Sequence, residues 1–507
     1  MLKRSSGSPP WSTSPEALPA AVGLAIIGGV LIVAGMGMDR IPLDALSAFI
    51  TLLVLLAATV PVLTWMARQE GDPDLFRILF WGMVATVIGM GVRYFFVIVV
   101  YNDSSDAGIY SEGAILLLAD FKKGVFSTIP PNMENFPPES QRVALVVTAI
   151  YTLTGASRWA ASFVFAWMAF AGRLMLWRAL KRAVPEADHK RYLMWLMFFP
   201  SLLFWPASIG KEALMILAIG VVSYGAALLF SEKVTSGGIL IFVAGVVGLM
   251  FVRPHMAAIA VAALGLSSLV GSLGQIGKGA ALKSTLVRAG ALVVLVVVAV
   301  VVLSQTSKVF GGSDGSAGGV GGVLDKTKNQ TSIGGSRFTA PAVSSPLDLP
   351  WATVTVLFRP FPWEARSLNS VVSSLEGLLL LGVVAAGWRR YVGGAKLALR
   401  RPYLVFVATF TIVFIMAFSY IGNFGILVRQ RTQLLGLLLV FLAIPPVARG
   451  RGLFRSSEEQ LDPEEHTDLA AGVGASEMRS DDGVPRPITS PVRFVADRSA
   501  ESLNRTV

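Results

Sequence analysis

Residues 75–101 read LFRILFWGMVATVIGMGVRYFFVIVVY, a long and mostly apolar stretch. A helix needs about 20 such residues to cross roughly 30 Å of hydrocarbon, so the stretch predicts a membrane-spanning helix. The polar run NDSSDAGIY follows directly at residues 102–110 and carries two carboxylates. The chain is therefore expected to leave the membrane into an acidic connection.

The composition of the whole chain points the same way. Of its 507 residues 54% are hydrophobic and 15% are charged, and the mean hydropathy is +0.65, which is too apolar for a soluble globule. We expect an all-α, polytopic integral membrane protein with about twelve transmembrane helices. The apolar segments lie at about 18–38, 43–67, 75–101, 159–179, 193–208, 212–230, 238–252, 255–272, 286–303, 374–390, 403–421 and 432–447.

The chain is expected to have three parts. Residues 1–17 are interpreted as a disordered cytoplasmic N-terminus, and residues 18–448 as the transmembrane domain. Residues 449–507 are rich in Pro, Ser, Glu and Asp and predict a disordered cytoplasmic tail. Two long connections, 102–158 and 304–373, interrupt the membrane domain. A glycine-rich run in the second one suggests either a mobile lid or a spacer without a role.

Charge predicts the orientation of the chain. With the N-terminus inside, the connections on the inner side hold sixteen Lys and Arg residues and the short outer connections hold five. Because positive charge accumulates on the cytoplasmic side, both termini are expected inside and both long connections outside. This assignment requires that 143–154 does not span, so we expect it to form a re-entrant or interfacial helix.

The remaining composition limits the possible partners and cofactors. Anionic headgroups of membrane lipids account for the net charge of +11, and no basic-aromatic motif for nucleic acid is present. Cysteine is absent and the three histidines are scattered, so a disulfide framework and a thiolate or His-based metal site are not expected. No cofactor is predicted firmly. A divalent metal would have to be held by oxygen ligands.

The acidic connection supplies the candidate catalytic residues, Asp103 and Asp106. With Tyr110 they are spaced i, i+3, i+7, so a helix would place all three on one face. A solvated amphipathic helix would explain this pattern without any function. Alternatively, a carboxylate near the headgroup plane could take a proton from an acceptor hydroxyl during group transfer.

A second group of residues at the predicted outer face suits a lipid-linked phosphate. Arg429 and Arg431, at the entrance to the last apolar segment, are the strongest candidates. Guanidinium groups match phosphate oxygens in geometry, and charges inside hydrocarbon are costly and usually functional. Interfacial belts or bilayer headgroups would explain the same residues. The candidate substrate-binding residues are Tyr110, Arg253, Arg359, Trp363, Glu364, Arg429 and Arg431.

The order of these features resembles polytopic GT-C glycosyltransferases that use polyprenyl-phosphate-linked sugars. The resemblance covers roughly residues 75–260 and includes Asp103-x-x-Asp106-x-x-x-Tyr110, Pro137-Pro138, Phe204-Trp205 and Arg253-Pro254. It implies Asp103 or Asp106 as the base, a polyprenyl-phosphate sugar donor, a glycan or lipid acceptor, and the inner membrane of a bacterial cell. In the family, the acidic residue can also help to position a metal.

The end of the membrane domain suggests a related alternative. Asn423-Phe-Gly425 followed by Arg429-Gln-Arg431 is similar to bacterial polysaccharide polymerases and ligases. We therefore expect a transfer enzyme of cell-envelope biogenesis, with a polymerase or ligase as the alternative. A transporter or flippase of lipid-linked oligosaccharide is the competing class. It would need charges around a cavity at the middle of the membrane and, usually, repeated halves.

Overall fold

The computed structural model describes residues 23–25, 28–29, 42–100, 105–231, 235–273, 337–339, 343 and 345–446. The chain divides into two units, residues 1–447 and residues 448–507. The first is helical, as expected, and no strand occurs in the described part of it. The predictions for residues 1–17, 449–507, the segment 286–303 and the glycine-rich run fall outside the described residues.

Six of the described helices are long and apolar enough to cross a membrane, in agreement with a membrane protein. The expected count of about twelve spans is not confirmed. A seventh crossing is possible by combining two helices, α16 (Trp388–Ala398) and α17 (Pro402–Phe418), into one span. These two helices are bent by 119° at the break between them. The six are α2 (Pro42–Glu70), α3 (Pro73–Phe95) with the π-helix Phe96–Val100, α6 (Arg158–Ala183), α9 (Lys211–Leu229), α15 (Leu368–Ala386), and α18 (Phe424–Leu438) with the 3₁₀ turn Leu439–Ala443.

Three further helices are apolar but do not belong to this set of six. They are α10 (Ser236–Val252), α11 (Pro254–Leu273) and α14 (Leu349–Phe358). The apolar segment 193–208 is broken into α7 (His189–Phe198) and α8 (Pro200–Phe204). Proline disfavours the helical conformation in the residue before it, and Phe199 is extended at the break. Residues 205–210 then form a non-helical turn.

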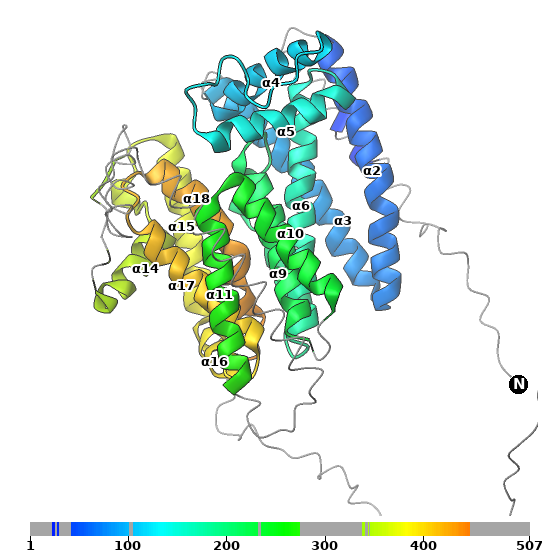
Figure 1. Ribbon diagram of the computed structural model, residues 1–507. Coiled ribbons are helices and arrows are strands. Elements are labelled where there is room, and N and C mark those ends of the chain that lie inside the picture. The colour runs from blue at the N-terminus through cyan, green and yellow to red at the C-terminus, as the bar shows by residue number, and fades with distance from the viewer. Residues whose placement is uncertain are drawn as a thin grey trace, which may run out of the picture. The chain divides into compact units, whose positions relative to one another are not determined.

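Small residues allow the central helices to approach closely. A Cβ atom on Gly172 of α6 would lie 2.4 Å from the carbonyl oxygen of Ile216, and one on Gly220 of α9 would lie 2.3 Å from that of Gly172. Gly225 of α9 and Gly245 of α10 show the same kind of contact. Such close contacts suit a membrane interior, where helices associate mainly by packing. Figure 1 shows α6, α9 and α10 side by side.

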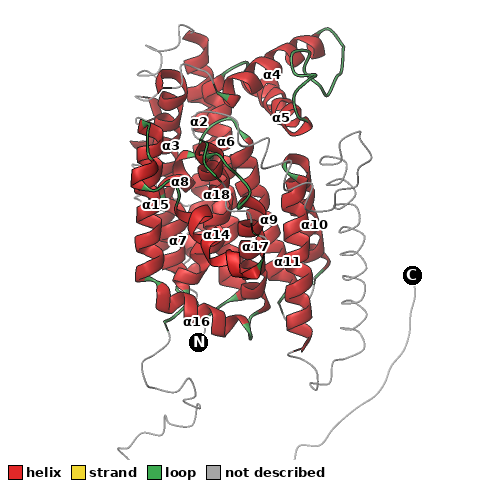
Figure 2. Cartoon of the chain, turned by 90° about the vertical axis from the view of Figure 1, so that its left-hand side faces the viewer, coloured by secondary structure: helices red, strands yellow, loops and turns green. Residues whose placement is uncertain are grey.

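Two helices lie across the end of this bundle. α4 (Asp106–Lys122) and α5 (Pro138–Thr154) pack on each other, and both views place them beyond the end of α10 (Figures 1 and 2). α5 contains the stretch 143–154 and is not among the helices long and apolar enough to cross a membrane, and its re-entrant or interfacial position stays a prediction. Arg142 of α5 donates to the carbonyl of Phe251 at 2.6 Å, which joins α5 to the end of α10.

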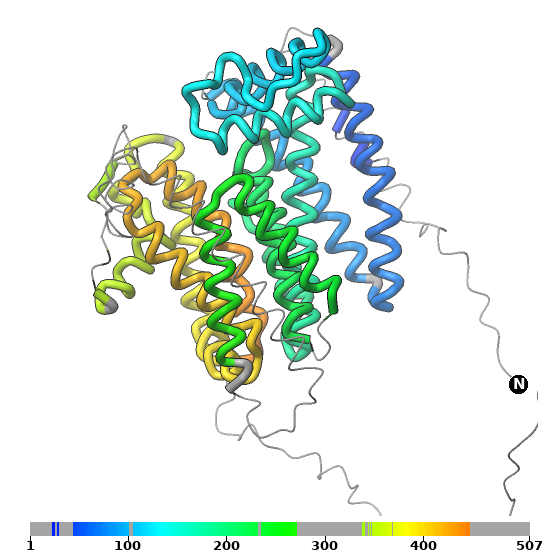
Figure 3. Tube along the Cα trace, in the orientation of Figure 1, coloured from blue at the N-terminus to red at the C-terminus, as the bar shows by residue number. Residues whose placement is uncertain are grey.

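The bundle has two ends. α4 and α5 lie across one of them, here called the α4/α5 end, and α16 lies at the opposite one, here called the α16 end (Figure 2). α10 and α11 form a hairpin that turns at the α4/α5 end, as the green segment of Figure 3 shows. Arg253 is the residue at this turn.

Candidate functional site: a pocket at the α4/α5 end

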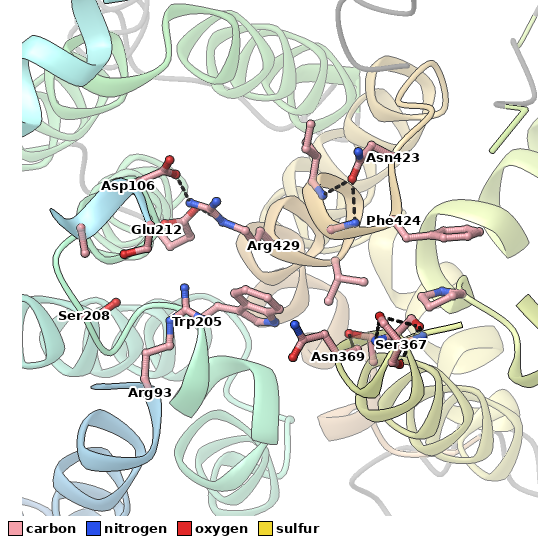
Figure 4. Close-up of a pocket in the computed structure, with 18 of the residues that line it drawn as sticks. Arg93, Asp106, Trp205, Ser208, Glu212, Ser367, Asn369, Asn423, Phe424 and Arg429 are labelled. Atoms are coloured by element: carbon pink, nitrogen blue, oxygen red, sulfur yellow. Dashed lines mark hydrogen bonds and ion pairs between the residues drawn. The ribbon is translucent and has the colours of Figure 1, made fainter. Parts of the chain in front are cut away.

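A pocket of about 400 Å³ opens at the α4/α5 end, a size typical of small-molecule sites (Figure 4). Its lining comes from the end of α3, the start of α4, the turn before α9, and the starts of α15 and α18. The lining mixes polar and apolar side chains. Its charged and amide side chains are Arg93, Asp106, Glu212, Asn369, Asn423 and Arg429.

A three-residue charge network occupies one side of the pocket. Arg429 Nη2 lies 2.9 Å from Asp106 Oδ2 and 3.1 Å from Glu212 Oε1, so one guanidinium bridges two carboxylates (Figure 4). Arg429 Nε also donates to Glu212 Oε1 at 3.2 Å. Glu212 is only 4% exposed, whereas the side chain of Asp106 is 48% exposed. The buried carboxylate therefore depends on Arg429 for its charge partner, while Asp106 is also open to solvent.

Local helix signals bring these groups together. Ser105 is the N-cap of α4, which makes Asp106 its first residue, and Glu212 stands in the first turn of α9. Asn423 caps α18, where its Oδ1 accepts from the backbone N–H groups of Gly425 at 2.9 Å and Ile426 at 3.2 Å. An acidic residue is favoured at a helix N-terminus because the helix dipole is positive there.

Within the described residues, four helices begin at the pocket, namely α4, α9, α15 and α18. The N-terminus of a helix presents unpaired N–H groups and a positive dipole. Together with Arg93 and Arg429, these termini make the pocket suitable for an anion such as a phosphate. The carboxylates next to them could accept a proton from a hydroxyl group. The arrangement therefore combines phosphate recognition with acid–base chemistry.

Arg93 and Trp205 both line the pocket and contact each other. Arg93 is 8% exposed, and its guanidinium carbon lies 4.9 Å from the ring centroids of both Phe204 and Trp205. This stacking holds the indole in place where it lines the pocket. α3 changes to a π-helix three residues after Arg93, a local irregularity that is frequent at functional sites.

Two of the sequence-predicted residues, Asp106 and Arg429, meet in the pocket. Asp103 lies outside the described residues. Tyr110 is 4% exposed and does not line the pocket. Burial and the charge of Asp106 raise the pKa of its hydroxyl, and Ser140 hydrogen-bonds to it. Tyr110 therefore stays a neutral hydroxyl that anchors α4 on α5.

The predicted pair of phosphate-binding arginines is separated by the structure. Arg431 is 1% exposed, and its Nη1 donates to the carbonyls of Leu357 at 2.6 Å and Arg359 at 3.1 Å. It joins α18 to the end of α14 and does not line the pocket. α18 begins at Phe424, eight residues before the predicted segment, so both arginines stand deeper in the helix than the sequence suggested.

The other predicted substrate-binding residues do not line the pocket. Arg359 Nη2 forms an ion pair with Glu364 Oε1 at 2.8 Å, so these two residues neutralise each other. Trp363 is 79% exposed and stacks on Phe361. Arg253, at the α10–α11 turn, is half-buried, and its charge acts on Glu212 from outside the lining.

Several pocket residues were not predicted as site residues, among them Arg93, Trp205, Glu212 and Asn369. Lys211, the sequence neighbour of Glu212, pairs with Glu139 at 3.6 Å, whereas Glu212 pairs with Arg429. The sequence does contain a signal for Arg93, which lies inside the apolar segment 75–101. A cation in such a segment is costly in a membrane and is usually functional. In the described part of the chain, no cluster of three or more His, Cys, Asp or Glu residues could hold a metal ion. The predicted oxygen-ligand metal stays a prediction.

No family model, no curated protein and no solved structure matches this chain. A function for the chain therefore has to come from the pocket residues and their chemistry.

Proposed function

We propose that the protein is a membrane glycosyltransferase that moves a sugar from a polyprenyl-phosphate or polyprenyl-diphosphate carrier to a glycan or lipid acceptor outside the cytoplasm. The observation that supports this best is Arg429, held between Asp106 and Glu212 in a pocket where four helices begin. A cation next to a carboxylate is what transfer from a phosphate needs, and the surrounding apolar helices suit a lipid carrier.

In the proposed reaction, Arg429 and Arg93 bind the carrier phosphate. The phosphate leaves as the bond to the anomeric carbon breaks, and fixed cations stabilise the charge that it gains. The acceptor oxygen forms the new bond, and its proton passes to Asp106. Asp106 is the better base of the two carboxylates because its side chain is 48% exposed and reachable by an acceptor.

Phosphate binding would also prepare this base. In the structure Asp106 is paired with Arg429 at 2.9 Å. A phosphate that takes this position on Arg429 would release the carboxylate to accept a proton. Glu212, which is buried and bonded to the same guanidinium, would keep Arg429 in place as a positioning residue.

A polymerase or ligase that transfers a whole glycan is the second candidate. The observation in its favour is that the start of α18, where the chain resembles such enzymes, lines the pocket from Asn423 to Arg429. Both candidates share the chemistry of transfer from a phosphate-linked carrier. They differ in the size of the group that is transferred.

The experiment is a transfer assay with the purified chain in lipid nanodiscs. Radiolabelled polyprenyl-phosphate and polyprenyl-diphosphate sugars serve as donors and an envelope glycan extract serves as acceptor. We expect label in the glycan and free carrier phosphate in equal amounts. If the labelled lipid moves between the leaflets of proteoliposomes and no sugar is transferred, the protein is a transporter and the proposed function is wrong.

A further inference from the structure

The pocket has two chemically different sides. All four charged residues of its described lining, Arg93, Asp106, Glu212 and Arg429, come from α3, α4, α9 and α18. The opposite side consists of Pro360 and the start of α15. It presents one amide and three hydroxyl groups and no charged side chain among the described lining residues.

The polar groups of this neutral side come from the first turns of α15. Ser367 caps the helix, and its hydroxyl lies 3.0 Å from that of Ser370. The side-chain amide of Asn369 stands between them in sequence, and no hydrogen bond from it to another described residue is recorded. An amide offers two donors and one acceptor oxygen, so Asn369 can bind a ligand that carries several hydroxyl groups.

Trp205 lies between the two sides. Figure 4 shows its indole between Arg429 and Asn369. Phe204 packs against the indole edge to face at 5.2 Å, and Arg93 stacks on it, so the ring is fixed before any ligand binds. A rigid aromatic face attracts the C–H groups of a sugar ring, because the face carries partial negative charge.

From this division we infer that the start of α15 and Trp205 form a subsite for the sugar itself, and that the sugar is an uncharged, polyhydroxylated ring. The inference rests on the proposed function. The ring stacks on Trp205, its hydroxyls bond to Asn369 and the α15 serines, and its phosphate reaches the cations on the other side. A sugar carboxylate would be buried on the neutral side without a cation, which is unfavourable.

The test compares two lipids that differ by the sugar alone. Binding of decaprenyl phosphate and of decaprenyl-phosphoryl mannose to the purified chain is measured by native mass spectrometry. The mannolipid should bind more tightly than the bare phosphate. Asn369→Ala and Trp205→Leu should each weaken mannolipid binding by about tenfold or more, and Asn369→Ala should leave binding of the bare phosphate unchanged. Asn135→Ala, at an exposed asparagine between α4 and α5, is the matched control.

The outcomes separate the two proposals. Binding of neither lipid by the wild type would contradict the proposed function. Equal binding of both lipids by the wild type, or equal weakening of both by Asn369→Ala, would overturn the sugar subsite and leave the phosphate site standing. Tighter binding of a decaprenyl-phosphoryl uronic acid than of the mannolipid would overturn the assignment of a neutral sugar. Bare-phosphate binding shows in each variant that the pocket is folded.

Discussion

The two ends of the helix bundle carry charges in contrasting ways. At the α16 end, Lys190 pairs with Asp72 at 2.9 Å and with Asp74 at 3.2 Å, and each of these side chains is between 27% and 59% exposed. At the α4/α5 end, Glu212 is 4% exposed and shares Arg429 with Asp106. Every member of the first cluster is partly exposed, whereas the second contains a buried carboxylate, Glu212.

This difference in burial predicts which charged side chains matter for the stability of the fold. Exposed ion pairs contribute about 0–1 kcal/mol, because water screens them and competes for their partners. Removing one member of a buried pair leaves the other charged and without compensation, which costs several times more. Charges at the α16 end are therefore expected to tolerate substitution, and charges at the pocket are not.

The sharpest test of the comparison is the side of the membrane on which each end lies. The chain contains no cysteine, so single cysteines can be placed at Asn135, between α4 and α5, and at Ala395 of α16, both of which are exposed. We expect an impermeant maleimide to label the first in whole cells and the second only after lysis. The reverse pattern would place the pocket in the cytoplasm and exclude an extracytoplasmic acceptor.

The largest effect on activity is expected from the proposed base. Asp106→Asn keeps the size of the side chain and removes its basicity, so turnover should fall by about 10²–10⁴-fold. Glu112→Gln, at an exposed site on the same helix, should leave turnover unchanged. The measurement is the transfer assay under saturating donor. Near-normal turnover of Asp106→Asn would assign the proton transfer to another group.

A smaller effect is expected on carrier binding. Arg429→Lys keeps the charge but loses the guanidinium fork that reaches Glu212 and the phosphate, so the Kd for decaprenyl phosphate should rise by about tenfold. Arg429→Ala should raise it further. Arg366→Ala, at an exposed arginine outside the pocket, is the control. An unchanged Kd in both variants would remove Arg429 from the phosphate site.

Arg431, two residues along the same helix, should affect stability instead. Arg431→Met fills similar space but leaves the carbonyls of Leu357 and Arg359 without their donor. We expect a loss of about 2–4 kcal/mol of unfolding free energy, measured in denaturant, with carrier binding per folded molecule intact. A variant of normal stability with weakened carrier binding would return Arg431 to the phosphate site.

The smallest effect belongs to the α16 end and depends on pH. Lys190 lowers the pKa of Asp72 below its ordinary value of 3.8. A lowered pKa in the folded state stabilises the protein above the unfolded pKa, and this contribution is lost as the pH falls through the folded pKa. Asp72→Asn should therefore change the Tm slightly at neutral pH and not at all in strong acid. A large drop at neutral pH would contradict the comparison of the two ends.

Sequence alone determined the class of the protein and part of its site. Apolar segments of sufficient length predicted helices such as α3 and α6, because in a membrane the backbone must satisfy its own hydrogen bonds. The acidic run after residue 101 and the arginines near 430 pointed to Asp106 and Arg429. The number of spans was not determined, since a broken segment such as 193–208 is apolar whether or not it forms one helix.

Tertiary structure decided which of the candidate residues meet. Asp106 and Arg429 are 323 residues apart in sequence, and no pattern within either segment specifies their contact. Arg429 and Arg431 are nearly adjacent, yet one lines the pocket and the other is buried against α14. Residues two apart on a helix point in directions that differ by roughly 200°. Which direction faces the pocket depends on how α18 packs among α8, α9 and α14, and only the folded bundle sets that packing.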